Sequence, residues 1–320
     1  MLNFLISIEG AAVQGILWGI LALGVFITFR VLDFADLSVE GTFALGGSVA
    51  AILITKGMNP FLVMIFSLFA GALAGMVTGL LHTVFKIPPI LSGILTMIAL
   101  YSINIRIMDD KATLQLIGAD KFTTISSNLV SKLIPSIPYN QIDNIATGIV
   151  GIIFVAIVIA VLYIFFGTEI GSVIRATGNN EYMVRALGTN TDMMKVIALM
   201  LSNGLVALSG AMVAQQQGYA DVQMGVGSIV IGLASVIIGE VIFCHKDHSF
   251  AYKLTAIVLG SVIYRIIVAV ALRMGLKAND LKLITAIIVA LALGLPVIVR
   301  KIKTNSMKKK IKKSNSAKEG

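Results

Sequence analysis

Eight polar or charged side chains lie inside long apolar stretches of this sequence, and their types and positions suggest what chemistry it could do. They are Gln14, Asn104, Asn203, Gln215, Gln216, Gln217, Glu240 and Arg265. A polar group is costly inside a membrane, so it marks either the path of a solute or a contact between helices. The four residues that we expect to line such a path are Gln14, Asn203, Gln215 and Gln216. Hydrogen bonding between helices, or a polar helix end, remains the alternative for each.

The two charged members of this set raise a separate question. Arg265 must either pair with an acid, for which Glu240 is the nearest choice, or extend toward the membrane surface. We expect Arg265 to have a structural role of this kind rather than to contact a solute.

Signatures of catalysis are absent from the sequence. It has no glycine-rich phosphate loop ending in Gly-Lys-Ser/Thr and no His-Glu-x-x-His, and its one cysteine is Cys244. His245 and His248 fall in a short polar stretch that reads as a solvated turn rather than a metal site. We therefore expect no catalytic, cofactor-binding or metal residue, and a membrane-embedded enzyme is the least favoured class. Any ATP and Mg would be bound by another polypeptide.

A polar stretch in the middle of the chain predicts a short helix. Asn179 or Asn180 can cap its start, Glu181 suits its first turn, and Gly188 supplies a left-handed stop. The residues that we expect to form and flank it are Asn180, Glu181, Tyr182, Met183, Arg185, Ala186, Leu187 and Gly188. An isolated helix of about two turns is marginal in water, so docking onto a partner would stabilise it. A capped loop helix with no partner is the alternative.

Composition places these residues in a membrane protein. The 320 residues are 57% hydrophobic and 13% charged, whereas soluble domains average roughly 45 to 50% and 25%. A bilayer core about 30 Å thick needs roughly 20 apolar residues of helix. The nine apolar segments lie near 9–30, 41–56, 60–82, 89–106, 144–166, 192–215, 224–244, 252–272 and 281–300. The predicted fold is therefore an all-α, polytopic transmembrane helix bundle with about nine spans (eight to ten), in which the glycine-rich second and seventh spans are broken or re-entrant.

The charges predict an orientation. Of the net charge of +9, most comes from the final residues 301–320, a lysine-rich tail that suits a cytoplasmic anchor to anionic lipid rather than a nucleic-acid site. Counting spans back from a cytoplasmic C-terminus places 168–191 inside and 107–143 outside. We expect one transmembrane domain over residues 1–300, with the tail as a separate cytoplasmic segment.

An internal repeat appears at an offset of 185 residues. The aligned positions are Gly19, Ala22, Leu23, Phe34, Ala35, Asp36 and Gly47 with Gly204, Ala207, Leu208, Tyr219, Ala220, Asp221 and Gly232. The span count gives the two halves, about 9–106 and 192–300, opposite directions through the membrane. Inverted repeats of this kind are common in transporters; chance similarity between two Gly/Ala-rich segments is the alternative.

These motifs together carry a resemblance to a known family. The motifs are the run from Arg175 to Thr191, the Leu32 to Asp36 step, and the segment from Gly218 to Gly239. They resemble permeases of the branched-chain amino acid and ribose class of ABC importers. The resemblance covers most of the chain, from Gly15 to about Gly294. Within that class the pattern looks most like permeases for tryptophan or other amino acids. The resemblance implies that Asn180 to Gly188 form a coupling helix, although the segment lacks the Glu-Ala-Ala motif of other importer classes.

The resemblance further implies a permease subunit in the bacterial cytoplasmic membrane that moves a small solute inward by alternating access, an amino acid being the expected solute. Its implied partners are a separate ATPase subunit, an external substrate-binding protein or lipoprotein, and a second permease copy in a homodimer. Two alternatives remain: an ion-coupled secondary transporter, and an ABC permease for a sugar or nucleoside.

Overall fold

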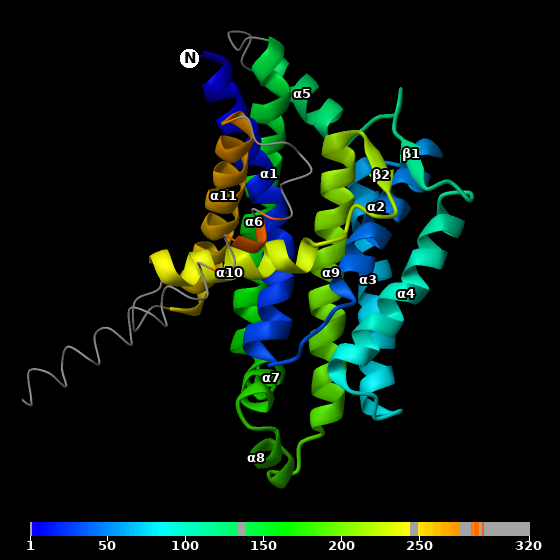
Figure 1. The fold of residues 1–320 in the computed structure, drawn as a ribbon, viewed down its shortest axis with the longest axis vertical. Helices are drawn as coiled ribbons and strands as arrows, with labels where there is room; N and C mark the ends of the chain where they lie inside the picture. The colour runs from blue at the N-terminus through cyan, green and yellow to red at the C-terminus, as the bar shows by residue number, and fades with distance from the viewer. Residues whose placement is uncertain are drawn as a thin grey trace, which may run out of the picture.

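The computed structural model describes residues 2–133, 139–243 and 249–274, together with residues 283, 285–287 and 290. The helices are α1 (Leu2–Phe26), α2 (Val39–Thr55), α3 (Pro60–Thr83), α4 (Pro89–Ile107), α5 (Phe122–Leu133), α6 (Tyr139–Gly167), α7 (Glu169–Asn179), α8 (Glu181–Ala186), α9 (Thr191–Gln217), α10 (Ser228–Phe243) and α11 (Phe250–Arg273). A π-helical turn over Ile27–Val31 extends α1, and two short strands, β1 (Thr113–Gln115) and β2 (Tyr219–Asp221), complete the described elements. The all-α polytopic prediction is confirmed (Figure 1).

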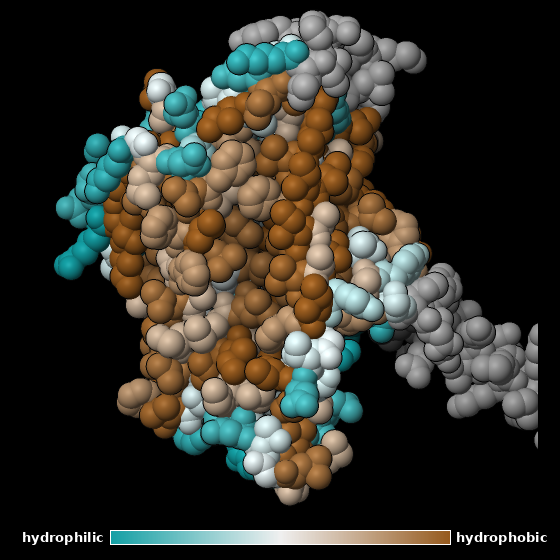
Figure 2. All heavy atoms as spheres, turned by 180° about the vertical axis from the view of Figure 1, so that it is seen from behind, coloured by the Kyte–Doolittle hydropathy of each residue, from teal (hydrophilic) through white to brown (hydrophobic). Residues whose placement is uncertain are grey.

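Six of these helices are long and apolar enough to cross a membrane: α1 with its π-helical extension, α3, α4, α6, α9 and α11. Figure 2 shows hydrophobic side chains covering most of one face of the molecule, with hydrophilic residues gathered toward its two ends. The exposed apolar residues belong to the outer helices; Phe69 of α3 and Ile164 of α6 are 60% and 68% exposed. A surface of this kind suits contact with lipid tails rather than with water.

The second and seventh predicted spans are the short helices α2 and α10, with 17 and 16 residues. At 1.5 Å per residue each is about 25 Å long, less than the roughly 30 Å of a bilayer core. The loop after α1 runs back into the bundle before α2 begins, and α10 lies across the long axis of the bundle (Figure 1). Both therefore start inside the protein, as expected for broken elements.

The two halves of the repeat pack reciprocally. α1 and α9 run in opposite directions along the bundle (Figure 1). α3 packs along α9. The counterpart of α3 in the second half is α11, which packs along α1. Each half thus supplies a central helix that is covered by outer helices of the other half, and this pseudo-symmetry is the geometry that the inverted repeat predicts.

Glycines allow this close approach. A Cβ atom added at Gly46 of α2 would overlap the carbonyl oxygen of Ala207 in α9, and one at Gly210 of α9 would overlap that of Phe43 in α2. In the other half, a Cβ at Gly260 of α11 would overlap the Ser235 carbonyl of α10. Small residues at such crossings let helix backbones meet, and van der Waals packing then replaces the hydrophobic effect that is absent inside a bilayer.

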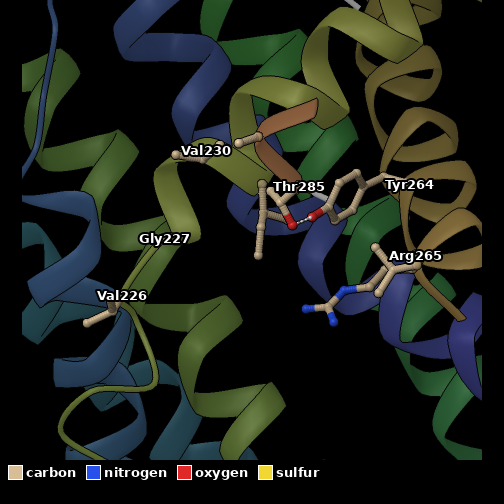
Figure 3. A pocket seen from close by; sticks show the side chains of 9 residues that line it. Val226, Gly227, Val230, Tyr264, Arg265 and Thr285 are labelled. Atoms are coloured by element: carbon tan, nitrogen blue, oxygen red, sulfur yellow. Dashed lines mark hydrogen bonds between the residues drawn. The ribbon is translucent and has the colours of Figure 1, made fainter. Parts of the chain in front are cut away.

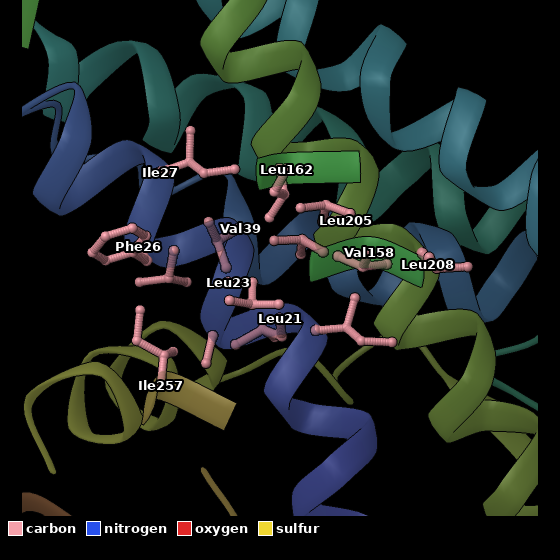
Figure 4. Packing of buried hydrophobic residues seen from close by; sticks show 14 of the residues in the cluster. Leu21, Leu23, Phe26, Ile27, Val39, Val158, Leu162, Leu205, Leu208 and Ile257 are labelled. Carbon is pink, nitrogen blue, oxygen red and sulfur yellow. The ribbon is translucent and has the colours of Figure 1, made fainter. Parts of the chain in front are cut away.

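The core lies where the central helices meet. Leu21, Leu23 and Ile27 from the first half are fully buried, and they lie near Leu205 and Leu208 of α9 (Figure 4). Trp18 and Phe43 add an aromatic pair with ring centroids 4.8 Å apart. This core positions the polar groups described below.

The polar segments gather at opposite ends of the bundle. The antiparallel pair of β1 and β2, with Leu114 opposite Ala220, and the helix α5 lie at the end that holds the N-terminus, whereas α7 and α8 lie at the other end (Figure 1). The described parts of 107–143 therefore lie at the opposite end of the bundle from 168–191, and they include the helix α5. The basic tail 301–320, most of the ninth span at 281–300, and Cys244, His245 and His248 lie outside the described residues.

Candidate functional site

The short helix predicted in the middle of the chain is α8, and side chains cap both α8 and α9. The Asn180 Oδ1 accepts a hydrogen bond from the Met183 amide at 3.1 Å, and Asn190 Oδ1 accepts one from the Met193 amide at 3.1 Å. Gly188 has a φ of +85°, a left-handed value that suits glycine. The predicted cap and stop are confirmed, and α8 therefore has fixed ends.

Ion pairs hold α8 against the start of α9. Glu181 accepts hydrogen bonds from Arg185 at 3.0 Å and from Lys195 at 2.8 Å, and Arg185 also reaches Thr191 at 2.9 Å and Asp192 at 3.3 Å. Partial burial alone would raise the pKa of the Glu181 carboxyl, but the hydrogen bond and charge of Lys195, with help from Thr191 and Arg185, hold that pKa below its usual value. A network of several charges fixes geometry better than an isolated surface pair.

The face of α8 that points away from α9 is apolar and uncovered. Val184 is buried, with 3% of its surface exposed, whereas Tyr182 is 86%, Leu187 76% and Met183 51% exposed. Ala186 is exposed as well. Large apolar side chains held out on a rigid, polar-rimmed helix are typical of a protein contact surface.

The pair α7 and α8 touches both central helices. α8 is bonded to α9 through Lys195, and at the end of α7 a Cβ atom on Gly178 would overlap the carbonyl oxygen of Val31, the last residue of the π-helical turn of α1. Movement of α8 would therefore be transmitted to the two helices that are counterparts in the repeat.

Asn203, which is predicted to lie on a path, belongs to a buried polar cluster. Its Nδ2 donates to the Asp36 carboxylate at 2.7 Å, and Ser38 donates to the same carboxylate from its hydroxyl at 2.5 Å and its amide at 2.9 Å. Asp36, Ser38 and Asn203 are all fully buried. The sequence highlighted Asp36 only as part of the repeat, although a carboxylate between two apolar spans was a signal for such a cluster.

The counterpart of Asp36 makes the same local bond. Asp36 accepts from the amide two residues on, that of Ser38, and Asp221 accepts from the amide of Gln223 at 2.7 Å. Each aspartate turns the chain before a short helix, α2 or α10. The repeat is thus present at the level of single hydrogen bonds.

The other predicted path residues are not brought together. Gln215 is fully buried and its side chain accepts from the Phe122 amide at 3.0 Å, so it joins α9 to α5. Gln216 has a buried side-chain oxygen with no partner among the described residues. Gln14 lies beside Arg265, at 3.4 Å from its Nη1. The structure therefore separates Gln14, Asn203 and the glutamines of α9 into three places.

The predicted pairing of Arg265 with Glu240 is wrong. Glu240 binds Arg30 instead, through Nε at 3.1 Å and Nη2 at 2.5 Å. The Arg265 guanidinium lies 4.0 Å from the centroid of the Trp18 ring. The sequence offered no signal for either contact, because Arg30 and Glu240 are far apart in the chain and α10 is turned so that its end meets the end of α1.

Within the described ranges, no group of three or more His, Cys, Asp or Glu side chains could hold a metal ion. The fold provides a helix bundle with an apolar outer surface and inverted halves. At one end, α8 holds out the exposed apolar side chains of Tyr182, Met183, Ala186 and Leu187, which we call the α8 knob. Those features define the class as a multi-pass membrane permease.

The chain belongs to the family described as the permease component of branched-chain amino acid transport systems, whose model matches residues 7–302. It is 40% identical to a tyrosine transport system permease protein of Clostridioides difficile, over 95% of this chain and 92% of the relative. It is 24% identical to a probable branched-chain amino acid transport permease of Methanocaldococcus jannaschii (63% and 64%), and 32% identical to a ribose import permease of Haemophilus influenzae (60% and 55%). No solved structure matches the chain.

Proposed function

We propose that this chain is the membrane subunit of an ATP-binding-cassette importer and that α7 and α8 couple it to a separate ATPase subunit, which binds the ATP and Mg. The single observation that carries this proposal is the rigid apolar knob of α8, linked to both central helices. Closure of the ATPase subunits would push on α8, and its ties to α9 and α1 would tilt the two halves so that the path opens to alternate sides.

The proposed solute is an amino acid. The support is the tyrosine permease of C. difficile, which is similar to this chain over nearly its whole length, whereas the ribose permease matches only 60% of it. Family membership favours an ATP-driven importer over an ion-coupled transporter. A sugar or nucleoside remains the alternative solute, because sugar permeases are among the relatives.

The remaining partners follow from the same proposal. An external substrate-binding protein or lipoprotein would dock at the end that carries α5, β1 and β2, and a second copy of this chain would complete the path as a homodimer. We place the protein in the bacterial cytoplasmic membrane, with α8 and the lysine-rich tail in the cytoplasm and the tail beside anionic lipid. Residues 1–300 act as one permease domain.

The coupling role can be tested on the exposed knob alone. Tyr182→Ser with Leu187→Ser removes two exposed side chains and leaves Val184 and the ion network intact. Since truncation of a central contact residue costs about 2 kcal/mol or more, we expect at least a tenfold loss of the ATPase subunit that copurifies with the permease. ATP-dependent amino acid uptake in cells should fall with it.

The matched control is Ile117→Ser with Leu129→Ser, two residues that are 83% and 57% exposed at the opposite end of the molecule. These changes should leave ATPase binding unaltered. Normal copurification by the α8 double variant would refute the coupling role, and uptake that continues after ATP depletion would refute the importer.

A further inference from the structure

Arg265 is a cation inside the bundle with too few partners. Its Nη1 donates one long hydrogen bond to Gln14, and its Nε is buried with no hydrogen-bond partner among the described residues. No described carboxylate forms an ion pair with it, because Glu240 is bound to Arg30. An arginine in the middle of a membrane helix is costly unless an opposite charge or a polar partner meets it. Among the described residues, the Arg265 guanidinium therefore has no counter-charge.

A cavity opens beside this cation. It has a volume of about 330 Å³, and its lining includes Val226, Gly227, Val230, Tyr264, Arg265 and Thr285. Figure 3 shows Arg265 reaching from α11 on one side, with Val226, Gly227 and Val230 on the other. The Tyr264 and Thr285 hydroxyls are hydrogen-bonded to each other at 2.8 Å, so each already has a polar partner. The volume lies at the low end of the range for small-molecule sites, and the walls are mostly apolar.

The start of α10 faces the same cavity. Gly227, Val230 and Ile231, at and just inside its N-terminus, are part of the lining. The N-terminal end of a helix carries a partial positive charge. Broken membrane helices in transporters place such ends near anionic groups of their substrates. The helix end and the guanidinium therefore both favour a negatively charged ligand.

We propose that Arg265, oriented by Trp18 and Gln14, binds the carboxylate of the transported solute, and that the apolar walls of the cavity receive its side chain. A guanidinium presents donors that match a carboxylate in two parallel hydrogen bonds, and stacking on an indole ring fixes its plane. The ligand class is an apolar or aromatic amino acid, or another small monocarboxylate with an apolar body. This inference rests on the proposed function, which makes the cavity part of a transport path.

The protein contains its own probe for this site. Trp18 is the one tryptophan of the sequence, and the Arg265 guanidinium lies directly over its ring. Fluorescence of the full-length protein in phosphatidylcholine nanodiscs, excited at the tryptophan band, should change saturably on addition of L-phenylalanine or 3-phenylpropanoate. L-Phenylalaninamide, which lacks the carboxylate, should give at least a tenfold weaker response. This titration needs neither the ATPase nor ATP, so its failure is distinguishable from failure of the importer proposal.

Variants assign the response to Arg265. Arg265→Gln should weaken L-phenylalanine binding at least tenfold, whereas Arg265→Lys, which keeps the charge, should retain the preference for the acid over the amide. The control is Arg273→Gln, a change two turns further along the same helix and outside the cavity. If Arg265→Gln does not fold, the comparison of acid with amide in the natural protein and in Arg265→Lys decides.

Three outcomes would overturn the inference: equal responses to the acid and the amide, no response to either acid, or an unchanged response in Arg265→Gln. A fourth concerns the source of the anion. If phosphatidylglycerol in the nanodisc changes Trp18 fluorescence and L-phenylalanine does not, Arg265 binds a lipid phosphate and the inference is wrong.

Discussion

At the scale of single residues, the carboxylate of Asp36 needs hydrogen bonds from its neighbours in order to be buried. It is fully buried and takes hydrogen bonds from Ser38 and from Asn203, which belongs to the other half of the repeat. A buried carboxylate without partners is strongly unfavourable, so these bonds hold the loop before α2 to α9. Asn203 therefore links the two halves of the repeat, and its place on a path stays a prediction.

Replacing Asn203 with alanine should destabilise the protein by about 1 to 3 kcal/mol, because one oxygen of Asp36 would lose its partner inside the bundle. The measurement is the midpoint of thermal unfolding of the purified protein in detergent. Asn128→Ala, at an exposed position of α5, is the control and should leave the midpoint unchanged. An equal midpoint for Asn203→Ala and the natural protein would contradict this role.

Contacts between individual side chains were the features least predictable from the sequence. Gln14 and Arg265 were both marked in the sequence as polar groups in apolar spans, but their proximity to each other and to Trp18 depends on how α1 and α11 pack. The pairing of Glu240 was mispredicted for the same reason. Residue type shows that a buried charge needs a partner, whereas only the packing of helices shows which partner it has.

At the scale of elements, α8 is held by charges that respond to acid. The pKa of Glu181 is lowered in the folded protein, so its ion pairs contribute stability fully above the ordinary glutamate pKa of about 4.3. That contribution is lost as the pH falls from this value through the lowered pKa, because the carboxyl then takes up a proton.

We therefore expect the amides of α8 to exchange with deuterium faster as the pH falls below about 4.3, after correction for the intrinsic pH dependence of exchange. Hydrogen exchange read by mass spectrometry on peptides covering Glu181–Ala186 measures this. In Glu181→Gln the protection should be lower at neutral pH. It should also change less across the same range, because the only acid of the network that then still titrates is Asp192. Burial alone would raise the pKa of Asp192, but the hydrogen bond and charge of Lys86 and the charge of Arg185 lower it. A pH response of the same size in that variant would place its origin elsewhere.

The crossing of α2 and α9 is a second feature at this scale. A Cβ atom at Gly46 would overlap the backbone of Ala207, so Gly46→Ala must push the helices apart, at a cost of about 1 to 3 kcal/mol or more. Thermal unfolding of the purified variant should show a lowered midpoint. Gly167→Ala is the matched control, because a Cβ there would meet nothing within 4 Å. A midpoint for Gly46→Ala equal to that of this control would disprove the close crossing.

Elements were well predicted from the sequence. The apolar runs near 60–82 and 89–106 became α3 and α4 almost residue for residue, and Asn180 and Gly188 bound α8 as their chemistry requires. Length and side-chain type decide these features locally. The direction of α10 and the π-helical turn at Ile27–Val31 escaped prediction, because both depend on what the helix ends meet in three dimensions.

At the scale of the whole molecule, the polar segments divide between two ends. The side of the membrane that each end faces stays a prediction, and it rests on the lysine-rich tail. We expect a cysteine at Tyr182, placed in a Cys244→Ala background, to react with a membrane-impermeant maleimide only after the cells are opened.

Ile117→Cys in the same background is the control, since Ile117 is exposed at the other end and should react in intact cells. Labelling of the Tyr182 cysteine from outside intact cells would reverse the orientation and remove the proposed contact with the ATPase.

The reciprocal packing of the halves also bears on how the protein is made. Residues up to Ile107 leave the ribosome before α9 exists, so the glycine surfaces of α2 and α3 and the carboxylate of Asp36 enter the membrane without the helix that later covers them. A nascent chain in this state has incomplete packing and is prone to misassembly. Packing of the first half is therefore completed only when α9 inserts, and we expect a chain truncated before Thr191 to lack this packing and to be degraded by quality-control proteases.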